Sequence, residues 1–373
     1  MIRGRFISKA GTIIAVAVIA SGPALADPAN DTSAVEPASY ETFTPYERSI
    51  KHRIDYSIWT SALSNFVVSM GPPLRKRPFE PPKKLGTRQQ LGHNSIYRLD
   101  GSMVAFSFMN DEVRDSFTEY RRDLESVADQ IDLQAIPRNE QLAFWFNLHN
   151  VAMVEQIARA WPIRQPHEIM IDGVTLDEAK FITVEGVALS PRDIREKIVY
   201  ANWKSPKVIY GFWRGVIGGP AMQREAFTGP TVSDQLDRAA REFTNSRRGT
   251  EKRGGTLHVA TLYEEAAPYL FPDFEQDLRA HLRDYVEGDV MRMVEETSAV
   301  ETSLSERDIA DLAGGARANP YWSNGQIGAG IAALLYQRRE KFEYIDRKGL
   351  RTGQVIFSNI DLPGDPEDKG EVE

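Results

Sequence analysis

Residues 138–150 read RNEQLAFWFNLHN, and this stretch decides the interior of the fold. Its apolar side chains, together with Val151, Ala152 and Val154, fall on most faces of a helix instead of forming one stripe. A helix that is apolar on most sides is buried. Pro137 marks its start and Trp161-Pro162 follows its end. The sequence therefore predicts a central, buried helix from Pro137 to about Ala160.

Shorter elements are predicted on both sides of this helix. Before it, apolar residues at helical spacing predict an amphipathic helix over 112–130, and Asp100-Gly101 predicts the turn of a hairpin over 97–104. After it, we expect strands within 169–176, 181–189, 256–260 and 354–357, and helices from 233, over 272–287 and over 327–339. This mixture lacks a regular strand–helix alternation, so it predicts a helix-rich α+β single domain.

Two capping boxes predict further helix starts. Ser190 is followed three residues later by Asp193, and Ser305 by Asp308. In this pattern each of the two residues satisfies a free backbone N–H of the first helical turn. We therefore expect one helix to begin at Ser190, and a short helix to begin at Ser305 and end at Gly314-Gly315.

The central helix carries polar residues that need partners. Glu140, Asn147, His149 and Asn150 lie on it, and Trp145 and His149 share a face because they are one turn apart. An unpaired polar group in the core costs roughly 1–3 kcal/mol. Two interpretations stay open: a groove lined by polar groups, or a network that fixes neighbouring loops.

The same stretch resembles the N-E-q-x-A-F-W-x-N-x-Y-N signature of the domain-of-unknown-function family 547 (DUF547). The segments 188–196, 205–212, 218–220 and 235–243 resemble later motifs of the family in spacing and context, so the resemblance covers about residues 97–290. Family members commonly share a His and a Cys, which implies a thiol-hydrolase ancestry with a papain-like or transglutaminase-like fold.

This chain departs from the family at those two places. Ile209 stands at the family's His position and Gly219 at its Cys position. The chain contains no cysteine, so a thiolate nucleophile is excluded. Arg214 lies near the lost thiol position in the sequence and offers a fork for a carboxylate. The resemblance therefore implies a degenerate member of the family, with no catalytic residue assigned.

Several other classes of chemistry lack support in the sequence. No His, Cys, Asp or Glu residues show the spacing of a metal site, and we expect neither a metal nor a cofactor. The Gly-rich stretch 211–219 lacks the Lys-Ser/Thr of a phosphate loop, and no G-x-S-x-G serine elbow is present. The formal charge of −8 argues against nucleic-acid binding.

The N-terminus reads as an export signal. Arg3, Arg5 and Lys9 precede the apolar run 13–20, and Ala24-Leu25-Ala26 fits cleavage after Ala26. The apolar run is too short for a permanent membrane span. We therefore expect a periplasmic protein that begins at Asp27 and keeps no membrane span.

The rest of the chain divides by composition. We expect a signal peptide over 1–26, a flexible leader over 27–48, an N-terminal extension over 49–96, a DUF547-like domain over 97–290 and a C-terminal extension with an acidic tail over 291–373. The stretch 71–94 is rich in proline and basic residues. It is either a docking segment or an extended surface connection.

Besides a module that binds a partner through residues 71–94 or the C-terminal region, two classes of function follow. The first is an exported, non-catalytic domain of the cell envelope that binds or scaffolds an unknown protein, peptide or glycan. The alternative is a hydrolase or transferase whose chemistry has moved to the surroundings of Glu140 and His149.

Overall fold

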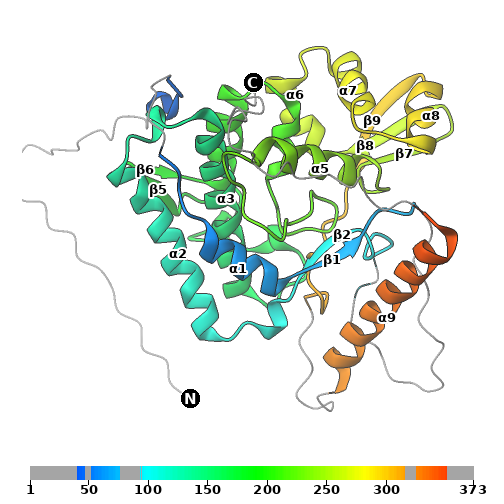
Figure 1. Ribbon diagram of the computed structural model, residues 1–373, viewed down its shortest axis with the longest axis horizontal. Helices are drawn as coiled ribbons and strands as arrows, with labels where there is room; N and C mark the ends of the chain where they lie inside the picture. The colour runs from blue at the N-terminus through cyan, green and yellow to red at the C-terminus, as the bar shows by residue number, and fades with distance from the viewer. Residues whose placement is uncertain (1–39, 47–51, 76–92, 94, 316–324, 351–373) are drawn as a thin grey trace, which may run out of the picture. The chain divides into compact units, whose positions relative to one another are not determined.

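Helix α3 (Arg138–Ala160) is the central element of the fold (Figure 1). Its five residues Leu142–Phe146 have 0% exposed surface. Helix α2 (Asp111–Gln130) packs along it through Phe117 and Leu124. The prediction of a buried central helix and of an amphipathic neighbour is confirmed.

The computed structural model describes residues 40–46, 52–75, 93, 95–315 and 325–350. The predicted signal peptide, most of the leader, most of the segment 71–94 and the predicted strand 354–357 lie outside the described residues. Within the leader, Tyr40–Phe43 forms a 3-10 helix, and the Phe43 ring packs edge-on against Trp145 at 5.1 Å. The leader expected to be flexible is therefore ordered from Tyr40, because Phe43 is buried in the core.

Helix α1 (Ser57–Phe66) leads directly into strand β1 (Val67–Gly71). Strand β2 (Gly101–Val104) pairs with β1 in antiparallel fashion. The expected hairpin over 97–104 is wrong, because residues 97–99 form a turn and β2 finds its partner upstream of the predicted domain boundary at 97.

Two small hairpins follow α3. Strands β3 (Met170–Ile171) and β4 (Val174–Thr175) form one, and β5 (Ile182–Val184) and β6 (Val187–Leu189) form the other. The π-helix η5 (Asp193–Val199), helix α4 (Tyr200–Asn202) and the 3-10 helix η6 (Pro206–Gly211) come next. The capping box is confirmed: Ser190 N donates to Asp193 Oδ2, and Asp193 N donates to Ser190 Oγ.

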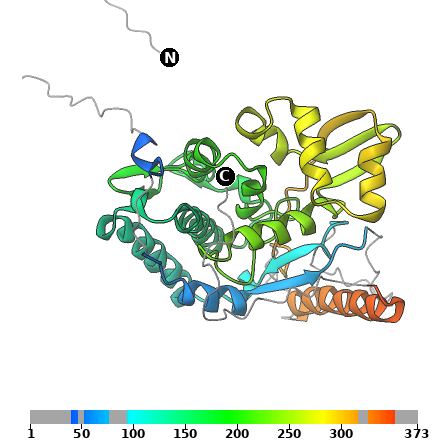
Figure 2. The ribbon, with the colours of Figure 1, turned by 45° about the horizontal axis from the view of Figure 1, so that its top comes forward.

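The C-terminal half builds a three-stranded sheet in the order β7-β8-β9, seen at the right of Figure 2. Its strands are β7 (Thr250–Arg253), β8 (Thr256–Ala260) and β9 (Ala299–Leu304). Helix α5 (Val232–Thr244) precedes the sheet, and α6 (Leu262–Leu270), α7 (Phe274–Arg283) and α8 (Gly288–Glu296) connect β8 to the parallel strand β9. Strand β9 falls in the predicted C-terminal extension, but it completes a sheet whose other two strands lie in the predicted domain 97–290.

The short helix expected from Ser305 is wrong. Asp308 does not cap a helix there, because its carboxylate accepts hydrogen bonds from Arg164 and Gln165. The backbone of 309–312 instead pairs with distant segments: Ile309 bridges Val216, and Asp311 bridges Val104. Helix α9 (Gly325–Lys348) then extends the predicted helix over 327–339 in both directions.

Among the described residues, short strands in four small sheets lie among many helices, which confirms the helix-rich α+β single domain. The remaining short 3-10 helices are Phe106–Phe108, Leu133–Ala135 and Pro166–Glu168. No helix within the described ranges combines the length and apolarity that a membrane crossing requires.

Gly211 allows η6 to approach α3 closely. A Cβ atom at this position would lie 2.4 Å from the Phe146 ring. The approach brings the Gly211 carbonyl within 2.9 Å of Asn150 Nδ2, which donates to it. The close contact thus positions the loop after η6 against the central helix.

We predict that Gly211→Ala destabilises the protein by about 1–3 kcal/mol, because the added methyl group overpacks the Phe146 ring. Gly255→Ala is the matched control, since a Cβ there meets only Ser298 Oγ at 4.0 Å. Urea unfolding of both variants measures the difference. Equal stability of the two variants would contradict the close approach.

Candidate functional site

Glu140 joins three segments of the chain. It lies in the first turn of α3, and its Oε1 accepts a hydrogen bond from Ile54 N at 3.0 Å while its Oε2 accepts one from Gly229 N at 3.1 Å. Burial raises the pKa of the Glu140 carboxyl, and the two backbone donors oppose that rise. Both carboxylate oxygens are therefore used to hold main chain.

Two asparagines of α3 hold loops in the same way. Asn147 Nδ2 donates to Phe227 O at 2.7 Å, and Asn147 Oδ1 accepts from Phe227 N at 3.0 Å. Asn150 Nδ2 donates to Gly211 O, and Asn150 Oδ1 accepts from Trp213 N, both at 2.9 Å. Each side-chain amide therefore forms with a loop the two backbone hydrogen bonds that a neighbouring strand would otherwise form.

His149 is neutral, and its tautomer follows from its contacts. The imidazole has 0% exposed surface. Its Nδ1 lies 3.0 Å from Asn150 Oδ1, and its Nε2 lies 3.3 Å from Arg195 NH1. Because a guanidinium only donates, Nε2 accepts and Nδ1 carries the proton. Burial, and then the Arg195 charge, lower the pKa of His149 to about 3.

Arg195 is the centre of a buried ionic network. Its guanidinium is fully buried and forms a paired contact with Asp177 (2.7 and 2.8 Å), and its Nε donates to Glu265 at 3.0 Å. Arg195 lies in the π-helix η5, a rare conformation that is frequent at functional sites. A buried cation needs such partners because its desolvation costs several kcal/mol.

The two carboxylates remain ionised in spite of their burial. Burial acts to raise the pKa of Asp177, but Arg195 outweighs it and the pKa falls well below its ordinary value. Burial likewise acts on Glu265, but Arg214 and Arg195 lower the pKa of Glu265 to about 2. Neither group is a proton donor near neutral pH.

Arg214 forms the outer part of this network. Its guanidinium makes a paired contact with Glu265 (2.7 and 2.6 Å), and its side chain is 22% exposed. Arg214 thus presents its fork to a carboxylate of the chain itself. Arg214, Glu265 and Asp177 are the points where the network reaches the surface.

The two positions that depart from the family motif carry no chemistry. Ile209 is 2% exposed and belongs to the apolar core. Gly219 is buried, and a Cβ there would meet only Val216 at 3.5–3.6 Å. The position has room for a small side chain, but the residues present supply neither a nucleophile nor a base.

Trp145 has 0% exposed surface and lies between aromatic neighbours. Its ring meets Phe43 and Phe144, each at 5.1 Å and nearly perpendicular. Its indole Nε1 has no hydrogen-bond partner among the described residues. Trp145 therefore contributes packing at this point and does not face a groove.

One nucleophile–base pair lies elsewhere. Ser303 Oγ is 2.7 Å from His258 Nδ1, and Glu301 Oε2 is 3.8 Å from the same nitrogen. In a serine hydrolase triad, the acid and the serine contact opposite ring nitrogens. Here both contact Nδ1, so the arrangement lacks the geometry of a triad.

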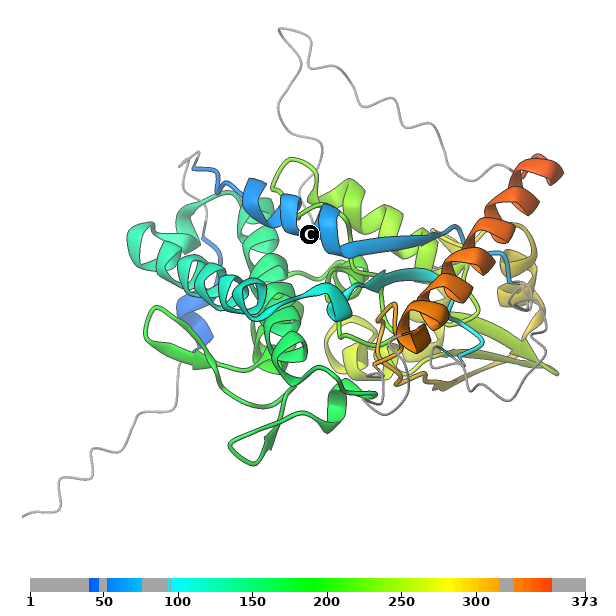
Figure 3. The same cartoon turned by 90° about the horizontal axis from the view of Figure 1, so that it is seen from below.

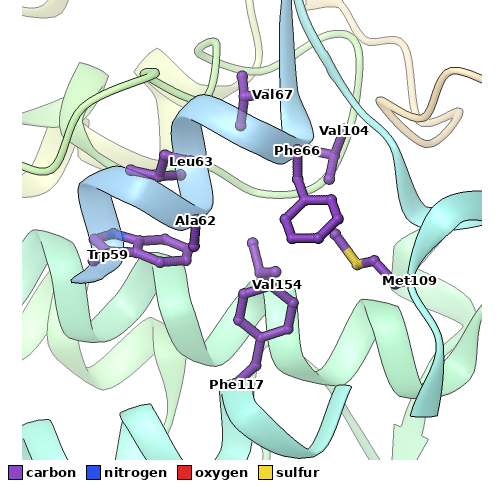
Figure 4. A pocket seen from close by; sticks show the side chains of 9 residues that line it. All are labelled: Trp59, Ala62, Leu63, Phe66, Val67, Val104, Met109, Phe117 and Val154. Carbon is purple, nitrogen blue, oxygen red and sulfur yellow. The ribbon is translucent and has the colours of Figure 1, made fainter. Parts of the chain in front are cut away.

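A small pocket lies under α1 (Figure 4). Its cavity volume is about 10 Å³, far below the roughly 300 Å³ of the smallest usual ligand pockets. All of its lining residues are apolar: Trp59, Ala62, Leu63, Phe66, Val67, Val104, Met109, Phe117 and Val154. The pocket therefore offers no group for acid–base or nucleophilic chemistry.

No three His, Asp or Glu side chains come together as metal ligands in the part of the chain that the structure describes. The residues of the buried ionic network, Arg195, Asp177 and Glu265, are not among the candidates that the sequence suggests. A signal for Arg195 exists in the sequence, because it stands directly after Asp193-Ile194 in the segment that resembles a family motif. Its partners give no such signal, since they are 18 and 70 residues away.

We predict that Arg195→Met destabilises the protein by about 3–5 kcal/mol, because it leaves Asp177 and Glu265 without their buried cation. Arg192→Met is the matched control: Arg192 lies one turn away with a 45% exposed side chain, and surface ion pairs contribute at most about 1 kcal/mol. Chemical denaturation compares the two. A smaller loss for Arg195→Met than for Arg192→Met would contradict the network.

A second prediction concerns pH. Burial lowers the pKa of His281, which contacts the Tyr210 hydroxyl at 2.8 Å, to about 4. Between this value and the ordinary pKa of 6.5 the folded state binds fewer protons at this group than the unfolded state, so the contribution of His281 to stability is full above pH 6.5 and is lost as the pH falls from 6.5 through 4. We expect His281→Gln to reduce that loss by roughly 3 kcal/mol. His52→Gln, at an exposed position, is the control.

Comparisons with known proteins place part of this architecture in a family. Residues 133–244 match the model of a family described as "Protein of unknown function, DUF547". The match lies inside the region 97–290 that carries the resemblance, and it contains α3, the π-helix and α5. No curated protein and no solved structure matches the chain. The segment 133–244, with α3 and Arg195 at its centre, belongs to the DUF547 family.

Proposed function

We propose that this chain is an exported protein of the cell envelope, and that its DUF547 domain binds or scaffolds a protein, peptide or glycan without catalysing a reaction. The proposal that the domain is not catalytic rests on one observation. The polar side chains of α3 that stand in the family motif are occupied by the chain itself: Glu140, Asn147 and Asn150 hold main chain.

His149 supports the same proposal. A general base must reach the proton that it removes, directly or through one water. His149 has 0% exposed surface, and both of its ring nitrogens contact other residues. A relocated hydrolase or transferase centred on Glu140 and His149 therefore has less support than a binding domain.

The export part rests on the sequence. The basic start, the apolar run and Ala24-Leu25-Ala26 have the order of a cleavable signal peptide. The absence of cysteine also means that folding outside the cytoplasm needs no disulfide formation.

The proposal is tested with the full chain produced in a Gram-negative bacterium. We expect the protein in the periplasmic fraction with Asp27 as its first residue, as determined by mass spectrometry. The purified protein should leave casein, peptidoglycan and p-nitrophenyl esters uncleaved and should not react with a fluorophosphonate probe. Both results follow from the proposed signal and from the occupied side chains.

Two outcomes would contradict it. An unprocessed protein in the cytoplasm would overturn the export assignment. Hydrolysis that is abolished by Glu140→Gln or His149→Asn, or fluorophosphonate labelling that is abolished by Ser303→Ala, would overturn the non-catalytic assignment. Circular dichroism shows whether each variant is folded, and Ser305→Ala is the matched control for the labelling.

A further inference from the structure

Strand β1 has one edge that no strand among the described residues covers. On its inner side, Phe66 O accepts from Ala105 N, so alternate backbone groups of β1 face β2. The far edge of β2 is already used, because Val104 N donates to Ala310 O and Val104 O accepts from Leu312 N. The outer edge of β1 is therefore the end of this sheet, and its carbonyls include Ser69 O.

Helix α9 lies beside the end of β1 (Figure 3), and two of its cationic side chains contact backbone carbonyls there. Arg338 Nε donates to Ser69 O at 2.6 Å. Lys341 Nζ donates to Leu99 O and lies 3.5 Å from Gly71 O. The two cations are three residues apart on one helix face. Arg338 occupies Ser69 O, a carbonyl to which a neighbouring strand would bond, and Lys341 lies at the end of β1 between Gly71 O and Leu99 O.

The contact between α9 and the edge carries a cost. Lys341 is 2% exposed, and Asp100 Oδ1 is 3.9 Å from its ammonium group. Burial lowers the pKa of Lys341 to about 8; Asp100 and Glu242 oppose the change, and Arg248 and Arg338 add to it. The docked helix thus holds a lysine whose charged form is disfavoured there, so a competing strand displaces it more easily.

We propose that α9 is an autoinhibitory strap, and that its release opens the outer edge of β1 to an extended peptide of a partner protein. The proposal deepens the binding function proposed above and rests on it. The peptide would pair with β1 as an added strand, the mode in which main-chain hydrogen bonds supply affinity.

The geometry of the edge favours an extended peptide. Carbonyls two residues apart on a strand repeat at roughly 7 Å, which is the repeat of N–H groups along one side of another strand. The edge contains Val67 and Val68, and β-branched residues favour strands. Gly71, with φ of 82° and a neighbouring ring of Phe342, ends the strand and limits the site to a few residues.

Charge favours a partner peptide over a second copy of the chain. Arg224 donates to Ser64 O, at the end of α1 that leads into this edge, and it remains there when α9 leaves. Symmetric pairing of two copies would bring their Arg224 side chains toward one another. A peptide with acidic residues meets the same arginine favourably.

The test uses the full chain with Arg338→Ala and Lys341→Ala combined. The matched control combines Arg339→Ala and Glu343→Ala, whose side chains are 63% and 56% exposed on the same helix. The probe is the labelled peptide Ac-Glu-Thr-Val-Thr-Val-Glu-NH2, and the control peptide has N-methyl groups on alternate amides. Fluorescence anisotropy gives affinity, and hydrogen exchange reports on residues 67–71.

We expect the double variant to bind the probe at least about 10-fold more tightly than the native chain and the control variant, because a larger fraction has an open edge. Exchange should increase in 67–71 and not in α3. Leu334 of α9 is 3% exposed and belongs to the apolar core, so a second variant, Leu334→Asp, should release α9 without changing either cation and should bind the probe as the double variant does. The N-methylated peptide should not bind any of the proteins.

Three results would overturn the proposal: equal probe affinity of all variants, equal binding of the N-methylated peptide, or dimerisation of the double variant in light scattering in place of probe binding. Exchange that increases throughout the protein would show that α9 is part of the global core, which also overturns it. A failure here leaves the export and hydrolysis experiments unaffected, so it is distinguishable from failure of the proposed function.

Discussion

The buried guanidinium of Arg195 is the constraint on which this architecture depends. A cation with no exposed surface requires acceptors on several sides, and Arg195 takes them from the loop after β4, from α6 and from α3. These segments are far apart in sequence, so the charge can be satisfied only when all of them are in place. The network thus links the family segment 133–244 to α6, which lies beyond it.

The polar residues of α3 extend this principle to main chain. Glu140, Asn147 and Asn150 each hold backbone groups of segments that lack a strand partner. These side chains, for which the sequence left open a groove lining or a structural network, thus connect loops to the central helix in the folded protein. A buried hydrogen-bonded network favours a single conformation when all of its polar groups have partners. Here the network determines how the loops run around α3.

Local signals predicted the long helices and several short strands, but not α1, β1, α6 or β9, and few of the long-range connections. Composition alone identified α3, and the Ser190–Asp193 box correctly marked a helix start. The same pattern at Ser305 and Asp308 failed, because Arg164 competes for the Asp308 carboxylate and 309–312 pairs with distant backbone. For the site, burial of Glu140 and the asparagines was foreseeable from the helix, but their loop partners were not. Asp177 and Glu265 could not be connected to Arg195, since only the folded chain brings them together.

The stretch 309–312 has a consequence for the order of assembly. Its main chain bonds to Arg164, Gly215 and Val104, and β9 just before it pairs with β8 across a three-helix crossover. Contacts of such large sequence separation form late, after their loop-closure entropy has been overcome. A ribosome releases this stretch only after the segments with which it pairs. Until then the earlier elements lack the backbone hydrogen bonds that 309–312 and β9 form with them. A nascent chain of this protein therefore depends on protection from proteases and aggregation.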